Sequence, residues 1–295
     1  MGLNTQVWVS QIQKNFYPDS SFLRETSDFS GLVEHDVINM AEAGIDPKVM
    51  INNTTYPVKM AERADTNHEI VLDEFSTENT VVREAEKVEL SYDKVESVIF
   101  SHRNSLQAAC AKKAAHAIAP AENTDFTPII GTTGAEVDGF KCLTVADILD
   151  LKTAFDEMDA PLDGRVLVLS PRHLRDLILA DLECFKDITD ITNGQPRMFA
   201  GFKIYPFTKV PTYSKTGAKN AYGAESADGD RPASFAFCKS EVMRADGSFT
   251  MFDRLRDPEE RGDIIGFSKR FVCLPIRNKG IGAIVPTAAA KTPTA

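Results

Sequence analysis

The feature that most constrains the fold is the stretch from Tyr92 to Ala119, which contains neither glycine nor proline. Its apolar side chains recur at the three- and four-residue spacing of one helix face. Ser91 is suited to cap the N-terminus of such a helix, Asp93 suits its first turn, and Pro120 stands just past its end. The sequence therefore predicts one long helix, whose alanine-rich second half permits close packing of neighbouring elements.

The segment before this helix begins with a pattern too broken for a stable core element. Residues 1–45 mix a short apolar stretch with a long polar run, which predicts an extended arm. Within it, apolar positions from Leu32 to Ala41 recur at helical spacing. A cap at Ser27 or Ser30 and a stop at Gly44 would complete a short helix there.

Residues 55–90 predict a polar, two-stranded excursion. His68 to Phe75 alternate in the manner of a strand, and the β-branched stretch from Thr77 to Val82 reads as its returning partner. The segment holds few large apolar residues to anchor it. Because an isolated two-stranded ribbon is marginal in water, we expect another subunit to pack on it.

Strands and helices alternate after the long helix, which predicts a mixed α/β region. A charged turn at Arg256 to Asp263 then separates two strands that we expect to pair. The remaining predicted elements are a helix from a Thr144 cap to Met158, a buried strand at Arg165–Leu169, a helix from Pro171 to Leu182, strands at Phe202–Pro206 and Ser234–Cys238, a surface loop at 212–232, paired strands at Phe249–Leu255 and Ile264–Leu274, and a last strand at Ile281–Val285 before a low-complexity tail.

The charged turn carries the candidate site. Both signs of charge alternate around Pro258 and Gly262, which is compatible either with a solvated hairpin tip or with an ion-paired contact between subunits. The tripeptide Arg261-Gly262-Asp263 matches a cell-adhesion motif, but three residues match by chance often. The residues that we expect at a subunit interface are Arg256, Asp257, Glu259, Glu260 and Arg261.

Composition excludes several other functions. The net charge of -10 has the wrong sign for a protein that neutralises nucleic-acid phosphates. The first twelve residues lack the basic and apolar regions of a signal peptide, and no run of about eighteen apolar residues occurs, so we expect neither secretion by that route nor a membrane span. The five cysteines form no CxxC pair and predict buried thiols.

No pattern predicts catalysis, a cofactor or a metal. The five histidines never take a metal-ligand spacing; His102 and His116 share the long helix but would lie about 21 Å apart. The glycine-rich stretch from Gly131 to Gly139 lacks the spacing of a phosphate-binding loop. Ser170 ends a strand and starts a helix, but Leu169 and Pro171 flank it where a nucleophile elbow needs glycines.

The order of these elements resembles the tailed-phage major capsid proteins, which share the HK97-like capsid fold. The family is defined by topology more than by sequence, so order and spacing carry the resemblance. The matching segments are Tyr56-Pro57 with 70–77, then 89–94, 166–171 with the helix 173–179, 201–204 with 209–211, 235–239, and the strand pair around 256–263.

The resemblance implies an α+β fold with an N-terminal arm, a two-stranded E-loop, a long spine helix, a peripheral domain and an axial domain. No covalent crosslink is expected, because nothing around Lys59 or Asn278 marks them as reactive. The implied boundaries are 1–45 for the arm, 46–90 for the E-loop, 91–125 for the peripheral domain with its spine helix, 126–248 for the axial domain, 249–275 for the peripheral-domain strand pair, and 276–295 for the final strand and a disordered tail.

The implied function is that of a major capsid (head) protein, not an enzyme, that self-assembles into an icosahedral shell around phage genomic DNA. The implied partners are copies of itself in pentamers and hexamers, a separate scaffolding protein, a portal and, in some relatives, decoration proteins; packaged DNA is met only non-specifically, and no membrane is involved. Such a protein is made in the bacterial host cytoplasm and resides in the virion. Two alternatives remain: an encapsulin-like nanocompartment shell, and a soluble α/β enzyme.

Overall fold

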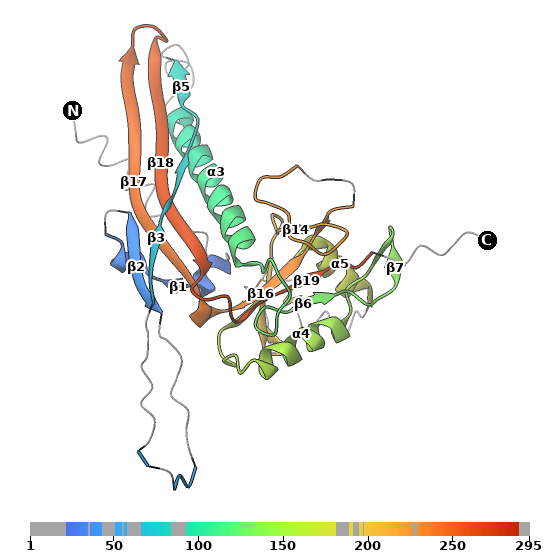
Figure 1. The fold of residues 1–295 in the computed structure, drawn as a ribbon. Helices are drawn as coiled ribbons and strands as arrows, with labels where there is room; N and C mark the ends of the chain where they lie inside the picture. Colours follow the sequence, from blue (N-terminus) through green and yellow to red (C-terminus); the bar gives the residue numbers. More distant parts are fainter. Residues whose placement is uncertain are drawn as a thin grey trace.

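A long antiparallel hairpin and a helix extend away from an α/β body in the computed structural model of the chain (Figure 1). The interior of the chain is divided between two main hydrophobic clusters, which meet opposite faces of one sheet in the body. The structure describes residues 22–34, 36–42, 51–54, 56–57, 66–83, 93–180, 189–190, 195–196, 198–225, 227 and 229–288.

The body is built on a six-stranded sheet with the order β12-β13-β9-β16-β19-β6. β9 and β16 are buried at every residue because both faces of the sheet are covered. Alternate side chains of β9 point to opposite faces: Val166 and Val168 face the end of the long helix, whereas Leu167 and Leu169 face the two shorter helices. The strands are β6 (Ile129–Gly131), β9 (Arg165–Leu169), β12 (Met198–Phe199), β13 (Phe202–Pro206), β16 (Ser234–Cys238) and β19 (Ile281–Val285).

Two short helices, α4 (Val145–Glu157) and α5 (Pro171–Ala180), cover one face of this sheet. Thr144 caps the N-terminus of α4, as the sequence predicts, and the structure adds a capping box. The Thr144 hydroxyl accepts a bond from the amide of Asp147, and the Asp147 carboxylate accepts one from the amide of Thr144 at 2.8 Å. Both helices and the buried strand between them are confirmed.

The elongated part consists of β17 (Val242–Asp257) and β18 (Gly262–Pro275), with the long helix α3 (Asp93–Ile118) beside β18. α3 buries Leu106, Cys110 and Ala114 against β18 and the body, so its alanines do allow close packing. The predicted long helix and the predicted strand pair are both confirmed. The predicted cap Ser91 lies outside the described residues.

The short helix predicted between Leu32 and Ala41 is wrong: the structure has a strand, β2 (Val37–Glu42), paired antiparallel with β3 (Thr66–Val71). Ile38 is fully buried in a small cluster with Leu72 and Met243. Pairing with a partner about 30 residues away in sequence overrides the weak helical spacing of this stretch.

The predicted pairing of 68–75 with 77–82 is also wrong. β4 (Asp73–Ser76) and β5 (Thr80–Arg83) both pair with β18, in the sheet order β1-β17-β18-β4 with β5 beside β18. Leu72 and Val82 are buried there. The two-stranded ribbon is instead β2 with β3, and it leads to the loop 43–65.

The predicted extended arm is wrong from residue 22 onward, where the described part of the chain begins. Phe22 and Leu23, in a 3-10 turn (Phe22–Glu25), are buried in the main core, and β1 (Ser27–Asp28) pairs in parallel with β17. The Phe22 ring meets the rings of Phe207 and Phe235 edge-on at centroid distances of 5.1 and 5.6 Å. The start of the arm, residues 1–21, lies outside the described residues.

Replacing Phe22 by alanine is expected to cost about 3–5 kcal/mol of unfolding free energy, because it leaves a cavity among packed aromatic rings. Replacing the exposed Leu32 by alanine, by contrast, should leave the midpoint of chemical denaturation nearly unchanged. Guanidinium denaturation followed by circular dichroism compares the two. A small effect of Phe22→Ala would show that this turn does not help to hold the core together.

The last strand, β19, lies as predicted at Ile281–Val285 and takes a central place between β16 and β6. Residues 289–295 of the predicted tail lie outside the described part. Among the described helices, none is long and apolar enough to span a membrane. The remaining short elements are 3-10 turns at Ser30–Leu32 and Lys239–Glu241 and the strand pairs β7 (Glu136–Val137) with β8 (Phe140–Lys141), β10 (Thr189–Asp190) with β11 (Gln195–Pro196), and β14 (Thr212–Tyr213) with β15 (Arg231–Pro232).

Candidate assembly surface

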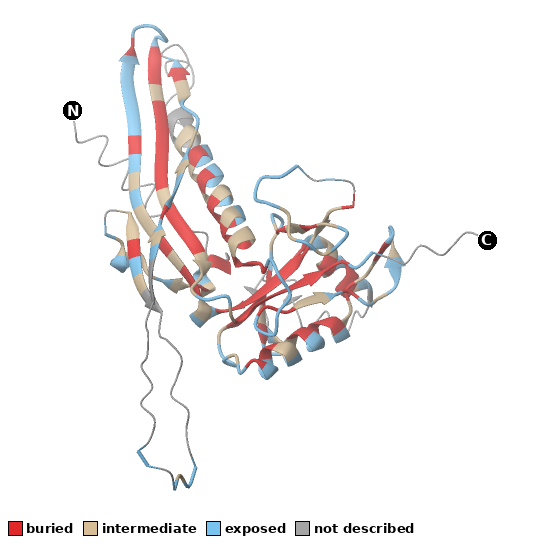
Figure 2. Cartoon of the chain, in the orientation of Figure 1, coloured by how far each residue is buried: buried red, intermediate tan, exposed pale blue. Residues whose placement is uncertain are grey.

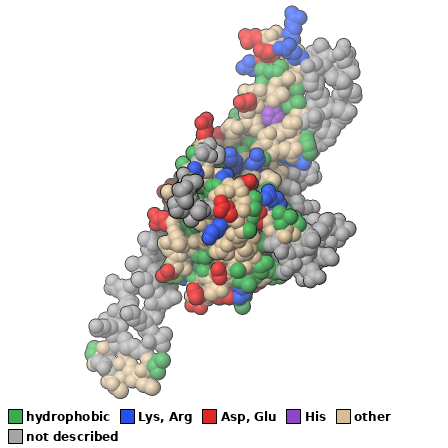
Figure 3. All heavy atoms as spheres, turned by 90° about the vertical axis from the view of Figure 1, so that its right-hand side faces the viewer, with side chains coloured by type: hydrophobic (Ala, Val, Ile, Leu, Met, Phe, Trp, Pro, Cys, Tyr) green, Lys and Arg blue, Asp and Glu red, His purple; other side chains and the backbone are tan. Residues whose placement is uncertain are grey.

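The five predicted interface residues lie together at the far end of the β17–β18 hairpin, and Figure 3 shows charged side chains of both signs gathered at that end of the molecule. They do not share one role. Asp257 is only 2% exposed, whereas Arg256, Glu259, Glu260 and Arg261 are all exposed.

Asp257 holds the turn of its own chain. Its carboxylate accepts bonds from Arg254 Nη1 at 2.6 Å, from the amide of Glu259 at 2.8 Å and from the amide of Glu260 at 3.3 Å. The bond from Arg254 and those from the turn amides lower the pKa of Asp257 below its ordinary value. The expectation that Asp257 meets an arginine of another chain therefore loses its basis, since its carboxylate is engaged within the turn.

The two arginines are presented outward by the backbone. Arg256 and Arg261 both have left-handed φ angles, 54° and 49°, and the amide of Arg256 donates to Asp263 Oδ1 at 2.8 Å. Within the described part of the chain, neither guanidinium has a carboxylate partner. Glu260 lies 3.7 Å from Arg83, both side chains being largely exposed. Arg256, Arg261 and Glu259 are thus the turn charges most open to a second molecule.

Large apolar side chains are exposed near the tip of the β17–β18 hairpin and in the segment between β2 and β3. The sequence analysis did not single out these residues. At the far end of the loop 43–65, Ile51 is 85% exposed and Tyr56 is 77% exposed. Beside the charged turn, Phe252 is 59% exposed and Leu255 is 45% exposed. Single exposed apolar side chains are ordinary, and others lie elsewhere on the described surface, such as Leu162 and Leu179. The pair Phe252 and Leu255 beside the charged turn is compatible with a contact surface.

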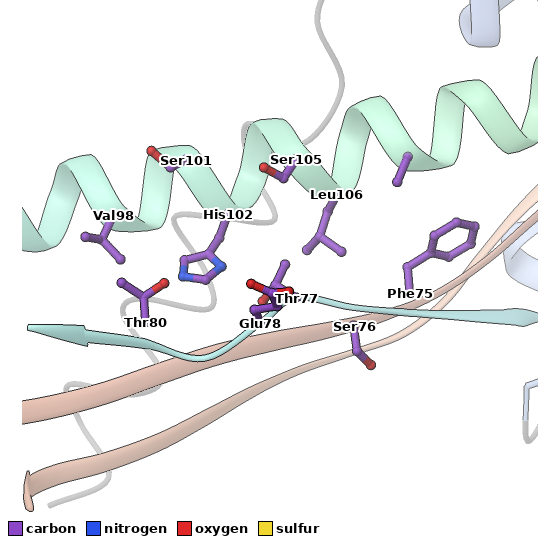
Figure 4. A pocket seen from close by; sticks show the side chains of 11 residues that line it. Phe75, Ser76, Thr77, Glu78, Thr80, Val98, Ser101, His102, Ser105 and Leu106 are labelled. Carbon is purple, nitrogen blue, oxygen red and sulfur yellow. The ribbon is translucent and has the colours of Figure 1, made fainter. Parts of the chain in front are cut away.

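A groove of about 570 Å³ runs between α3 and the segment that joins β4 to β5 (Figure 4). Val98, Leu106 and Phe75 form apolar walls, while Thr77, Thr80, Ser101 and Ser105 contribute hydroxyl groups. His102 points from α3 toward the strands, and its ring meets Phe267 edge-on at 5.3 Å. The groove can hold an apolar or mixed side chain of a second segment.

Among the described residues, the groove lacks the groups that a catalytic or metal site needs. Its titratable side chains among the described residues are His102 and Glu78. Burial lowers the pKa of His102, so the ring is neutral at pH 7, and its Nε2 atom lacks a hydrogen-bond partner. No nucleophile activated by a neighbouring base lies beside it, and no cluster of three potential metal ligands occurs in the described part.

The serine at the junction of β9 and α5 has a structural role. Ser170 is fully buried, and its hydroxyl accepts a bond from the amide of His173 at the start of α5. His173 Nδ1 lies 2.7 Å from Ser234 Oγ, and that same oxygen accepts the amide of Ser170 at 2.9 Å. Since all three residues are at most 1% exposed, this network fastens α5 to the sheet and meets no substrate.

The burial of His173 predicts an acid-sensitive fold. Burial, with Arg172 nearby, lowers the pKa of His173 to about 4 from 6.5, and the Asp147 carboxylate opposes this only in part. Between pH 6.5 and pH 4, His173 is protonated in the unfolded chain but still neutral in the folded one. Acidification over this range therefore lowers the free energy of unfolding by about 3 kcal/mol. Denaturation curves at pH 7 and pH 4.5 for the unaltered chain and His173→Gln should show a smaller loss in the variant. An equal loss would assign the acid sensitivity to other groups.

Comparison with known proteins gives solved structures only: no family model matches the chain, and no curated protein does. The capsid of Ralstonia phage GP4 superposes with a TM-score of 0.67 at 10% identity, over 95% of this chain and 92% of that one. A structure from Mycobacterium phage Che8 gives 0.63 at 16% identity, over 90% and 91%. The virus-like particle from Pyrococcus furiosus gives 0.60 at 12% identity, over 96% and 99%.

The chain has the capsid fold. The resemblance inferred from element order is thereby confirmed at the level of the fold. In each comparison the superposition covers nearly the full length of both chains. At 10–16% identity the likeness extends to the fold and not to individual side chains. The capsid fold occurs here both in phage particles and in the Pyrococcus particle, so it does not choose between those two kinds of shell.

Proposed function

We propose that the chain is the major capsid protein of a tailed phage, a subunit that self-assembles into an icosahedral shell around genomic DNA and catalyses no reaction. The observation that carries this proposal is the shape of the subunit. The β17–β18 hairpin extends away from the body, and at its tip Phe252 and Leu255 are exposed beside Arg256 and Arg261, which have no carboxylate partner among the described residues. Contact with other copies in a shell would bury them.

The proposed placement of the parts follows the capsid fold. The region 126–248, joined in its sheet by β19, serves as the axial domain and meets its copies around five-fold and six-fold axes. α3 serves as the spine helix and the hairpin with residues 91–125 and 249–275 as the peripheral domain near three-fold axes. Of the predicted E-loop, 46–90, only the part before β4 is proposed to keep that role, because β4 and β5 pair with β18. Each contact is weak alone, and many act together.

The proposed partners are further copies in pentamers and hexamers, a separate scaffolding protein, a portal and decoration proteins. Packaged DNA would be enclosed without specific binding, which suits a net charge of -10 on the subunit. The protein would be made in the host cytoplasm and retained in the virion. One alternative, an encapsulin-like shell around protein cargo, is kept, because the Pyrococcus virus-like particle shows the same fold outside the phage capsids.

Electron microscopy of particles purified from producing cells tests this function. We expect closed icosahedral shells, filled with DNA and attached to a tail when the chain is expressed within a complete phage. Small shells that hold protein and no DNA would favour the encapsulin-like alternative. The absence of any particle, with soluble subunits alone, would contradict both kinds of shell and return the soluble α/β enzyme to consideration.

A further inference from the structure

Two segments of the body carry opposite charge. Between Asp190 and Glu225 the sequence has no acidic residue and five basic ones. From Asp147 to Asp163 it has six acidic residues and one basic residue, Lys152. Because the whole chain has a net charge of -10, the first segment departs from the average and the second exaggerates it. The two segments are therefore electrostatic complements of each other.

The six-stranded sheet of the body keeps these two segments apart. α4, which makes up most of the acidic segment, packs in the core cluster on one face of the sheet. In the basic segment, Phe207 and Val210 lie on either side of Lys209 and pack with the cluster on the opposite face. Figure 2 shows exposed residues along the outer side of α4 and along the loop after β14, with the buried strands of the sheet between them.

The basic side of the body consists of the loop 207–224 and the adjoining end of α3. Lys112 and Lys209 are exposed there. Lys112 Nζ lies 5.7 Å from the centre of the Tyr222 ring, and this ring is 40% exposed. The basic side thus presents both ammonium groups and an aromatic ring to a partner.

The loop on the basic side is held against the end of α3. Lys219 Nζ donates to the carbonyl of Ala119 at 2.6 Å, and the hydroxyl of the buried Tyr213 donates to the carbonyl of Pro120 at 2.5 Å. Because the loop is already fixed, it loses little conformational entropy when it meets a partner. The basic side is therefore preorganised for binding.

The acidic side of the body lies at the C-terminal end of α4. Glu157, Asp159 and Asp163 are exposed there. Glu157, Asp159 and Phe126 line a hollow of about 380 Å³. Phe126 is 48% exposed, and Leu162 in the following turn is 73% exposed. Carboxylates beside exposed apolar side chains suit a partner that carries lysines and an aromatic ring.

Two cations also line this hollow without cancelling its charge. Arg277 Nη2 donates to Glu241 Oε1 at 2.7 Å, so this guanidinium already has a carboxylate within the chain. Lys279 Nζ lies over the Phe126 ring, 4.8 Å from its centre. Three carboxylates and two cations thus line the hollow, and Asp163 in the adjoining turn adds to the acidic excess.

We propose that the basic side of one copy, the loop 207–224 with Lys112, docks on the acidic side of the next copy at the end of α4. The proposal rests on the proposed shell-forming function and names the charged contact within its pentamers and hexamers. Because the two sides lie on opposite faces of the sheet, two copies related by a two-fold axis cannot join both pairs. Each copy therefore meets a different neighbour with each side, which is the head-to-tail contact that closes a ring.

Packaged DNA is another polyanion that the basic side could meet, but the observations favour a second copy. Lys113 lies 3.7 Å from the carboxylate of Asp73, and Lys219 is engaged by the carbonyl of Ala119. A surface that binds DNA phosphates presents many cations, whereas few remain exposed here. The acidic side of the same chain supplies a matching partner that is present in every subunit.

Carbodiimide crosslinking in assembled particles tests the proposal, because this reagent joins an amine to a carboxylate where the two are in contact. Particles are assembled from equal amounts of isotopically labelled and unlabelled full-length subunits. We expect crosslinked peptides that join Lys112 or Lys209 to the segment 157–163, with mixed labelling because the two peptides come from different copies. Uniform labelling, crosslinks of these lysines to other segments only, or none would overturn the proposal while the particles themselves uphold the shell-forming function.

Charge reversal provides an independent readout. Lys112→Glu with Lys209→Glu reverses the basic side, and Glu157→Lys with Asp163→Lys reverses the acidic side. Asp159 is kept, because its left-handed φ of 56° suits aspartate better than lysine. All four replaced residues are exposed, so both variants should retain their circular dichroism. Each variant should lose shell yield by about tenfold or more, since the contact recurs in every subunit, and the four changes together should restore most of it.

The outcomes separate this contact from its alternatives. Unimpaired assembly of either variant, or no recovery when the four changes are combined, would overturn the proposal. Normal shells of the basic-side variant that package less DNA would also overturn it and would assign the basic side to DNA. If the unaltered chain forms no particles at all, the proposed function fails and this inference fails with it.

Discussion

Replacing residues 43–65 with a short glycine linker between Glu42 and Thr66 is expected to give folded subunits that form no closed shells. The linker joins β2 to β3 directly, so the ribbon and its buried Ile38 are kept. What is lost is the end of the loop, where Ile51 and Tyr56 are exposed to solvent. Circular dichroism reports the folding of the subunit, and sedimentation velocity reports shells.

The bounds of this deletion matter. Removing Met60 to Arg83, the middle of the predicted two-stranded excursion, would also remove β3, β4 and β5 and the buried Leu72 and Val82. A milder variant, Ile51→Ser with Tyr56→Ser, controls for loop length and should reduce shell yield without abolishing folding. Normal shells from the glycine-linker variant would show that the loop makes no essential contact.

Reversing both outward arginines of the hairpin turn, Arg256→Glu with Arg261→Glu, is expected to leave the subunit as stable as before and to block closure of the shell. Neither guanidinium has a carboxylate partner within the described part of the chain. A single exposed ion pair contributes only about 0–1 kcal/mol, yet the same contact recurs in every subunit of a shell. Thermal denaturation measures the first effect and electron microscopy the second.

A compensating charge reversal distinguishes ion pairs between subunits from a general effect of the subunit's net charge. Glu259→Arg with Glu260→Arg, added to the reversed arginines, should restore part of the assembly, and raised salt should weaken assembly of the unaltered chain. Asp257 is left unchanged in every variant, because it holds the turn through Arg254. Unimpaired assembly of the double-arginine variant would make the turn a solvated hairpin tip.

The sequence predicted the helices and strands whose formation depends on residues close together in the chain. The helix α3 follows from an unbroken stripe without glycine or proline, and α4 follows from its Thr144 cap. The fully buried β9 and β16 read as continuous apolar runs. The strand partners around residues 37–83 could not be predicted in this way, because Ile38 and Leu72 find their place only through contact with Met243 of a distant strand.

The position of the charged turn was predicted from the sequence, but the roles of its residues within the turn were not. Alternating charges between two strands placed the turn correctly at the tip of the hairpin. The difference between buried Asp257 and exposed Glu259 depends on the fold of the turn, where two amides and Arg254 converge on one carboxylate.

The central claim, that this chain works by assembling with itself, is tested most directly by light scattering after size exclusion. The purified full-length chain is measured over a wide range of concentration, with and without its scaffolding protein. We expect rings or closed shells with masses many times that of the 32.5 kDa subunit. A mass equal to that of one subunit at every concentration, with scaffolding protein present, would contradict the account.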